Sequence, residues 1–376
     1  MRVGKRTTAL VLPNLKDIKI EDTSTVAFEL SGGNADFPFT LTDYHLTILP
    51  AKDDSVDWRS ADGCGSYILR DVNFGVSAML ERNSNHGRND VAWFDSIEML
   101  ALAGQNARTS ALISGDIDIA DRLDLKTVNL LARNQNIDIN EIAGTQHFAF
   151  SVSTNKSPFE NNHVRMALIH AINREEMVEK ILFGFGSVGN DIPVGKNQKY
   201  YNSDLEQRTY DPDKAKWHLK QAGMDGLSVD LSVADAAFNG AVDAGTLLQN
   251  SAKATGINLK AVREPNDGYW SSVWVHKPFS AAYWDGRPVM DKMFASAYTC
   301  GASWNDTFWC HERFEKLLVT ARAELDEAKR QEIVHNQSGA IIPMFANYVF
   351  GTSKKIGKPE IMWSNLDLDG SRWAER

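Results

Sequence analysis

The sequence predicts an α/β protein whose sheets are covered by helices, because segments with strand spacing alternate along the chain with segments with helical spacing. Every second residue is apolar in three separate places, at 26–30, 148–152 and 227–233. Apolar residues recur every three or four positions at 164–181 and again from residue 312 onward. With 376 residues and 43% hydrophobic content, the chain can form one large domain or two to three ordinary ones.

Each predicted strand is defined by its alternation. In the first, Val26, Phe28 and Leu30 fall on one face, which we expect to be buried. The second strand repeats the pattern with Phe148, Phe150 and Val152, and the third with Leu227, Val229, Leu231 and Val233. The glycine-rich stretch at 184–189 resembles a dinucleotide fingerprint, but it follows a helix where that motif requires a strand, so we expect a loop.

The predicted helices carry recognisable start and stop signals. A helix from Val164 is followed by Asn173 and Glu176, a capping box that starts a second helix. Asp211 and Pro212 are good cap and first-turn residues for a third helix. A fourth helix begins at residue 312, and its apolar stripe consists of Phe314, Leu317, Leu318, Ala321 and Leu325.

Composition excludes several classes of function. The chain has 49 acidic and 40 basic residues, a net charge of -9, so an electrostatic grip on nucleic acid is not expected. No stretch has the roughly 20 apolar residues of a membrane-spanning helix. The opening 17 residues contain basic residues but no complete secretion signal.

Three cysteines occur, at positions 64, 300 and 310. Cys300 and Cys310 bracket a loop that a disulfide could close, which would require an oxidising compartment, and two unpaired thiols are the alternative. Their spacing, with His311 next to the second, matches no zinc pattern. No metal or cofactor is expected.

Known catalytic motifs are missing from the sequence: there is no nucleophile elbow, P-loop or H-E-x-x-H pair. The unusual feature is a concentration of rings between Tyr269 and Trp309, interleaved with Gly, Asp and Asn. Such rings suit the wall of a ligand pocket, where flat apolar surfaces supply area and a few polar groups fix orientation. They equally suit a tryptophan-rich core.

Several segments, in order, resemble one protein family. The main segments are FAFSVSTNKSPFENNHVRMALIHAINREEMVEKILFG, YDPDKAKWHLKQAG, and ERFEKLLVTARAELDEAKRQEI followed by AIIPMF. They are similar to the periplasmic or extracellular solute-binding proteins of ABC importers, family 5. These proteins handle peptides, dipeptides, oligopeptides and nickel. DFPFTLTDYHLTILPA, SYILRDVNFGVSAMLERN and ALISGDIDIA add to the resemblance. It extends from about Val26 to Arg376.

The resemblance implies a two-lobed fold of the periplasmic-binding-protein type, class II, with mixed sheets. It places residues 1–150 in a first lobe, 151–350 in a second and 351–376 in a return to the first, with crossings near 151–155 and 345–352. It implies a monomer outside the cytoplasm that closes on a peptide or related small solute and delivers it to a membrane permease. It also favours a Cys300–Cys310 disulfide.

One position departs from the family. Where peptide-binding members carry an aspartate that pairs with the peptide's ammonium group, in the segment YWDGRPVMD, this chain has Arg287. A guanidinium repels an ammonium but pairs with carboxylate or phosphate, so we expect Arg287 to anchor an anionic group. The residues expected around it are Tyr269, Trp270, Tyr283, Trp284 and Asp285. The alternative is a structural ion pair between Arg287 and Asp285 or Asp291.

Two further departures concern completeness. Relatives have a long segment before the part that matches residues 17–30, and about two more helical turns near residues 332–335. We therefore expect the first lobe to be incomplete, and a non-functional truncated remnant is an alternative to a working binding protein. A hydrolase using Asp285 or His311 is a second alternative, and a non-transport interaction module is a third.

Overall fold

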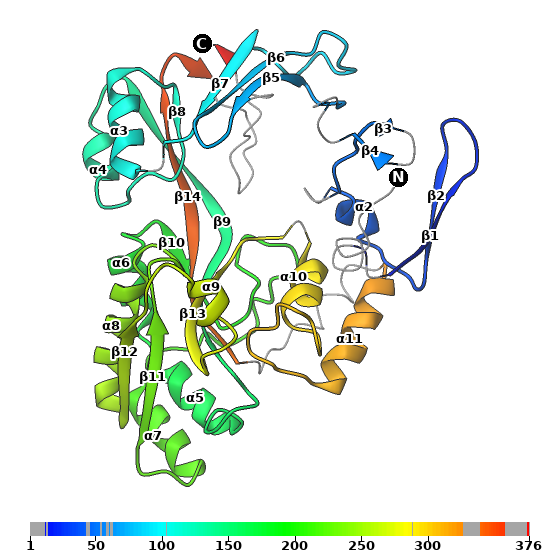
Figure 1. Cartoon of the computed structure of the whole chain (residues 1–376). Coiled ribbons are helices and arrows are strands. Elements are labelled where there is room, and N and C mark those ends of the chain that lie inside the picture. The colour runs from blue at the N-terminus through cyan, green and yellow to red at the C-terminus, as the bar shows by residue number, and fades with distance from the viewer. Residues whose placement is uncertain are drawn as a thin grey trace. The chain divides into compact units, whose positions relative to one another are not determined.

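The computed structural model describes residues 12, 14–42, 46–52, 55–57, 60, 63–102, 104–287, 289–325, 339–357 and 374–375 (Figure 1). The chain forms two compact units, Met1–Lys5 with Tyr44–Gly144 and Asn347–Arg376, called unit 1, and Arg6–Asp43 with Thr145–Ala346, called unit 2. The chain passes from one unit to the other inside β9 (Ile137–Val152) and β14 (Ala340–Ser353). The described residues 14–42, which we expected in the first lobe, group with unit 2.

The main sheet confirms the predicted mixed α/β architecture. Its strand order is β10-β14-β9-β13-β11-β12, and β8 (Ile119–Ala120) also pairs with β14. The other members are β10 (Gly186–Val188), β11 (Leu227–Val233), β12 (Ile257–Arg263) and β13 (Phe279–Trp284). β11 lies parallel to β12 and β13, whereas β13 runs antiparallel to β9.

Helices α5 (Asn162–His170), α6 (Arg174–Ile181), α7 (Pro212–Gln221) and α8 (Ala241–Ala252) belong to unit 2 (Figure 1). The predicted caps are present: the Asn173 side chain accepts from the Glu176 N–H at 3.1 Å, and Asp211 accepts from the Lys214 N–H at 2.9 Å. Each bond satisfies an amide that the first helical turn leaves unpaired.

Three expectations were wrong in detail. The 184–189 stretch contains strand β10, because the backbone of β14 approaches so closely that a Cβ on Gly186 would lie 2.5 Å from the Phe345 carbonyl oxygen. Helix α11 (Glu312–Ala323) ends before Leu325, since Glu324 adopts an extended backbone, and Leu325 is exposed. Strand β2 (Val26–Leu30) pairs with β1 (Leu15–Ile20) as a hairpin in which no residue is fully buried.

The core of unit 2 lies between the sheet and its helices. Phe150, Leu231 and Phe279 are fully buried. Arg174 is buried too, and it donates to Asp191 Oδ2 at 2.7 Å, while Asp191 Oδ1 accepts from the Ile342 N–H at 2.9 Å. A buried charge pair of this kind is tolerated because both partners are hydrogen-bonded.

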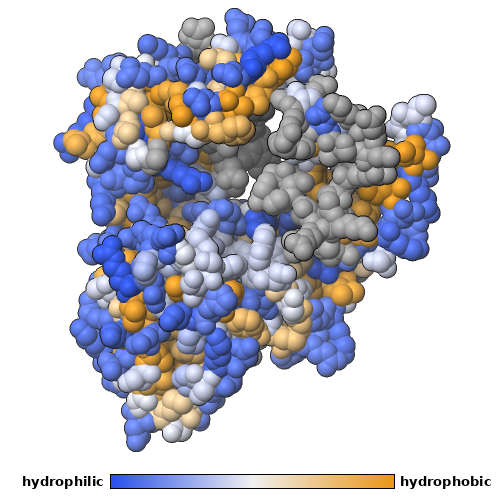
Figure 2. Space-filling view, viewed as in Figure 1, coloured by the Kyte–Doolittle hydropathy of each residue, from blue (hydrophilic) through white to orange (hydrophobic). Residues whose placement is uncertain are grey.

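Unit 1 has a different balance of buried and exposed apolar surface. Its helices α3 (Gln105–Ser114) and α4 (Val128–Leu131) bury Leu112 and Leu131. Its antiparallel meander of β5 (Tyr67–Asn73), β6 (Ser77–Arg82) and β7 (Ser96–Leu100) leaves apolar side chains exposed. Figure 2 shows apolar atoms gathered over this part of the unit.

The remaining short elements are α2 (Phe37–Thr40), β3 (Ala51–Lys52), β4 (Ser55–Val56), the 3-10 turn η2 (Lys253–Thr255), α9 (Tyr269–Ser272), α10 (Met290–Ala297), β15 (Ile356–Gly357) and β16 (Ala374–Glu375). Among the described helices none is both long and apolar enough to cross a bilayer.

Candidate functional site

The turn that carries Arg287 follows directly from the end of β13. Antiparallel pairing places Tyr283 opposite Phe148 and Trp284 opposite His147 on β9. Just beyond the paired residues, the side-chain amide of Gln146 donates to Asp285 Oδ1 at 2.7 Å. These contacts attach the start of the turn to the neighbouring strand, so the backbone that leads to Arg287 is held from one side.

Arg287 is half-buried, and its Nε is buried with no hydrogen-bond partner among the described residues. The structural ion pair that we considered for it is not formed within this part of the chain: Asp285 bonds to Gln146, and Asp291 bonds to Arg322 Nε at 2.5 Å. The guanidinium therefore keeps its capacity to bind an anion.

His147 lies beside this charge in the interior. Its ring is fully buried and packs on Phe345, with 5.3 Å between ring centroids. Burial first, and then the positive charge of Arg287, lower the pKa of His147 to about 3, although the backbone of Thr145 partly opposes the shift. The imidazole is thus neutral at ordinary pH, and Arg287 is the cation of the pair.

A row of rings, here called the aromatic wall, runs beside the turn and consists of Trp270, Trp274, Tyr283, Trp284 and Trp304. Trp270 packs edge-on against Tyr283 and against Trp274, with 5.5 Å and 5.6 Å between the ring centroids. The ring centroids of Trp274 and Trp284 are 6.3 Å apart, and those of Trp284 and Trp304 are 6.5 Å apart. The first three of these contacts are edge-to-face, a favourable arrangement for aromatic pairs, and the last is tilted.

Exposure divides the predicted ring residues into two groups. Trp270 and Tyr283 are 38% and 37% exposed, so both can meet a solute. Trp284 is buried in the middle of the wall, where it supports its neighbours. Tyr269 is also buried, and its hydroxyl donates to the Ala281 carbonyl at 2.8 Å, so the expectation that it lines a ligand surface needs correction.

The structure adds a residue that the sequence patterns did not single out. Asp306 is buried and accepts hydrogen bonds from Trp274 Nε1 at 3.1 Å and from Ser151 Oγ at 3.0 Å. Burial raises the pKa of Asp306, and the bonds from Trp274, Ser151 and Trp284 oppose that shift. No sequence spacing could reveal this group, because its donors come from segments more than a hundred residues apart.

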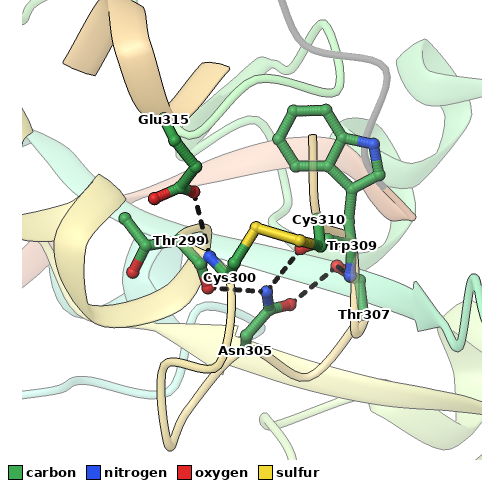
Figure 3. The surroundings of a disulfide bond; sticks show 7 residues. All are labelled: Thr299, Cys300, Asn305, Thr307, Trp309, Cys310 and Glu315. Atoms are coloured by element: carbon green, nitrogen blue, oxygen red, sulfur yellow. Dashed lines mark hydrogen bonds between the residues drawn. A yellow bond between two sulfur atoms is a disulfide. The ribbon is translucent and has the colours of Figure 1, made fainter. Parts of the chain in front are cut away.

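Asp306 lies in a loop closed by the disulfide between Cys300 and Cys310, the pairing that the family resemblance favours (Figure 3). The Cα atoms of the two cysteines are 4.7 Å apart. Inside the loop, the Asn305 side-chain amide donates to the Thr299 carbonyl at 3.0 Å and to the Trp309 carbonyl at 2.7 Å. The loop is therefore fixed at both ends and across its middle.

Residues 4–306 match the family described as bacterial extracellular solute-binding proteins, family 5 Middle, which is well over half of the chain. The chain belongs to solute-binding protein family 5. Members of this family are solute-binding proteins that act outside the cytoplasm.

Among curated family 5 relatives, the dipeptide-binding protein of Escherichia coli K12 is 30% identical over 236 residues, which covers 56% of this chain and 42% of that protein. The probable ABC transporter periplasmic-binding protein SapA of the same strain is 23% identical over 338 residues, 85% of this chain and 61% of that protein. The chain thus spans less than two thirds of the length of these relatives.

Several solved structures share the fold. The Helicobacter pylori protein DppA, in complex with the peptide STSA, superposes with a TM-score of 0.77 at 22% identity, covering 93% of this chain and 72% of that one. AgaA of A. tumefacien R10, in complex with agropinic acid, gives a TM-score of 0.77 at 20% identity, covering 94% and 75%. NikZ of Campylobacter jejuni, in complex with Ni(L-His), gives a TM-score of 0.81 at 16% identity, covering 98% of this chain and 80% of that one.

The residues considered for a hydrolase are engaged differently in this family 5 chain. Asp285 bonds to the Gln146 amide, and the ring of His311 stacks on Trp309 with 5.8 Å between centroids. Neither forms a hydrogen bond with a serine, threonine or cysteine side chain within the described part of the chain, the pairing on which an activated nucleophile depends.

Proposed function

We propose that this chain is the substrate-binding component of an ABC importer, and that it captures a peptide or related small solute and releases it chemically unchanged to permease subunits at the membrane. Membership of family 5 and the naming of its relatives support this role. We further propose that it works as a monomer in the periplasm or outside the cell, where a disulfide such as Cys300–Cys310 persists.

We also propose that the preferred solute carries an anionic group that Arg287 binds. The observation that carries this proposal is a half-buried guanidinium with no ion-pair partner among the described residues, next to an aromatic wall in which Trp270, Tyr283 and Trp304 are exposed. A guanidinium offers paired donors that match carboxylate or phosphate. The acidic solute named for the fold relative AgaA is compatible with such chemistry on this fold.

The roles of the remaining candidates follow from their exposure. Trp270 and Tyr283 would contact the apolar body of the solute, and Asp285, which is exposed, would interact with a donor group on it. Trp284 would act by supporting the exposed rings. Flat rings that supply contact area, with few polar groups that set orientation, are the usual composition of small-molecule sites.

Isothermal titration calorimetry with a panel of acidic, neutral and cationic peptides and sugar acids tests the proposal. Arg287→Ala should lower the affinity for acidic ligands by about 10- to 100-fold, because it removes one charged hydrogen-bonded pair. Arg287→Asp should shift the preference toward cationic ligands. Lys277→Ala removes the same charge from an exposed position of the same unit and should change nothing.

The possible outcomes separate the two parts of the proposal. Binding of an acidic solute that Arg287→Ala leaves unchanged would remove Arg287 from the site but keep the binding function. If a folded preparation of the chain bound no solute of any charge class, the substrate-binding role itself would be wrong.

A further inference from the structure

The centre of the aromatic wall is attached to one buried carboxylate. Asp306 Oδ2 accepts from the indole N–H of Trp274 at 3.1 Å and from the Ser151 hydroxyl at 3.0 Å, and the side chain of Trp284 acts on the same carboxyl and lowers its pKa. An indole has one donor, so a bond to a fixed acceptor defines where that edge of the ring points. Two neighbouring rings of the wall thus share one reference point.

Keeping this carboxylate in the interior is costly. Asp306 is 5% exposed, and within the described part of the chain no cation lies among the groups that act on it. A buried acid is tolerated only when donors replace its lost hydration. The donors at hydrogen-bond distance are Trp274 and Ser151, and Trp284 also favours the charged carboxylate. The tryptophans that stabilise Asp306 are therefore rings of the aromatic wall itself.

The loop around Asp306 is anchored on both sides, which a positioning role requires. The Thr307 carbonyl accepts from the Thr154 N–H at 2.8 Å and from the Thr154 hydroxyl at 3.0 Å. The Cys300 N–H donates to Glu315 Oε1 at 2.9 Å, and the disulfide closes the loop (Figure 3). These contacts hold the loop that carries Asp306 independently of the rings.

We propose that Asp306 is a positioning residue that fixes Trp274 and Trp284, and that it thereby holds the exposed ring of Trp270 in the orientation that meets the solute. This inference rests on the proposed binding function, because the ring contacts solute only if the wall is part of the site. We place Asp306 out of contact with the solute, since it is buried and its Oδ2 already accepts from Trp274 and Ser151.

Proton NMR of the tryptophan indole N–H groups tests the positioning without any ligand. The chain has ten tryptophans, and the variants Trp274→Phe and Trp284→Phe identify the two signals concerned. Asp306→Asn keeps the shape but removes the charge, so it should shift these two signals and leave the distant Trp217 signal in place. Ser151→Ala removes the third donor without altering either indole, and it is the matched control with the smaller shifts.

A wild-type measurement covers the case in which Asp306→Asn fails to fold. Acidification should move the Trp274 and Trp284 signals together, in one transition, as the shared carboxylate takes up a proton. Tyr298 also faces Asp306, but its burial raises its pKa away from this range. Two independent transitions, or none, would overturn the shared-acceptor assignment.

Affinity provides the second measurement. With an acidic solute that Arg287→Ala weakens, Asp306→Asn should weaken binding by about tenfold, the effect of a lost charged hydrogen bond. Shifted indole signals with unchanged affinity would overturn the link between the wall and the solute. If no solute binds at all, the proposed function fails, and the indole signals still decide whether Asp306 fixes the two rings.

Discussion

The position of Arg287 depends on a residue without a side chain. Gly286 precedes it in the turn, and a Cβ at that position would lie 1.6 Å from Thr145 Oγ1 and 2.5 Å from Thr145 Cβ. The turn can therefore approach β9 only because residue 286 is a glycine. Glycine is needed here because Thr145 lies so close, not because of the backbone conformation of residue 286. The fit therefore depends on both Gly286 and Thr145.

We expect Gly286→Ala to push the turn away from β9, to lower the free energy of unfolding by about 1–3 kcal/mol and to weaken acidic ligands by displacing Arg287. Chemical denaturation and calorimetry measure the two effects. Thr145→Gly removes the two side-chain atoms involved, so the double variant should recover most of the binding. Equal losses in the single and double variants would contradict the steric explanation.

At the scale of elements, α5 and α7 meet around three histidines. His163 Nδ1 and His218 Nδ1 are 2.9 Å apart, and the ring of His170 stacks on that of His218 at 5.8 Å. Burial first, then the nearby His170 and His163, lower the pKa of His218 to about 4, and burial lowers the pKa of His170. A second proton between the two close nitrogens would set two donors against each other.

This cluster should make the protein less stable in acid. The ordinary histidine pKa is about 6.5. Below that pH, His218 binds a proton in the unfolded chain but stays neutral in the folded protein. Stability is therefore lost as pH falls from about 6.5 toward 4. We expect His218→Asn to reduce the loss by about 1 kcal/mol, measured by denaturation at pH 7 and pH 4.5. The exposed His276→Asn is the control, and an equal change in both variants would contradict the assignment.

The bridged loop should contribute to stability in a way that reduction removes. For a sequence separation of 10 between the cysteines, loop-closure entropy predicts about 2–3 kcal/mol. The variant with serine at both positions should unfold at lower denaturant by that amount. Adding reductant to the wild type should reproduce the shift and should leave the serine variant unchanged, since its remaining Cys64 has no bridge to lose.

The elements show what the sequence can and cannot predict. Long alternating or helical patterns predicted β11 and α5 to α7 correctly, because their buried faces repeat over several residues. The three-residue β10 has too few residues for any period, and Gly186 and the adjacent Gly189, which suggested a loop, are required by the close backbone of β14. The ring-rich segment left a pocket wall and a tryptophan-rich core as alternatives, because whether Tyr269 or Trp270 is exposed depends on tertiary packing.

For the whole molecule, the two units differ in how well each buries its own apolar surface. In unit 2, Leu231, Val233 and Phe279 are fully buried in the sheet. In unit 1, strand pairing places Leu69, Leu80 and Ile97 on one face of the meander together with Val72, Ala78 and Met99. Val72 and Met99 remain about 40% exposed there, and Phe74 in the adjoining turn is 87% exposed.

This difference predicts unequal local stability. Amides of residues 67–100 should exchange with deuterium at low protection, because few buried contacts oppose local opening, whereas amides of 227–233 and 257–263 should exchange only on global unfolding. Mass spectrometry of peptides from the native protein measures both. Phe74→Ser should leave protection unchanged and reduce binding of a hydrophobic dye, since an exposed ring contributes surface but little packing. Protection of 67–100 equal to that of β11 would show that the apolar face of the meander is covered in solution.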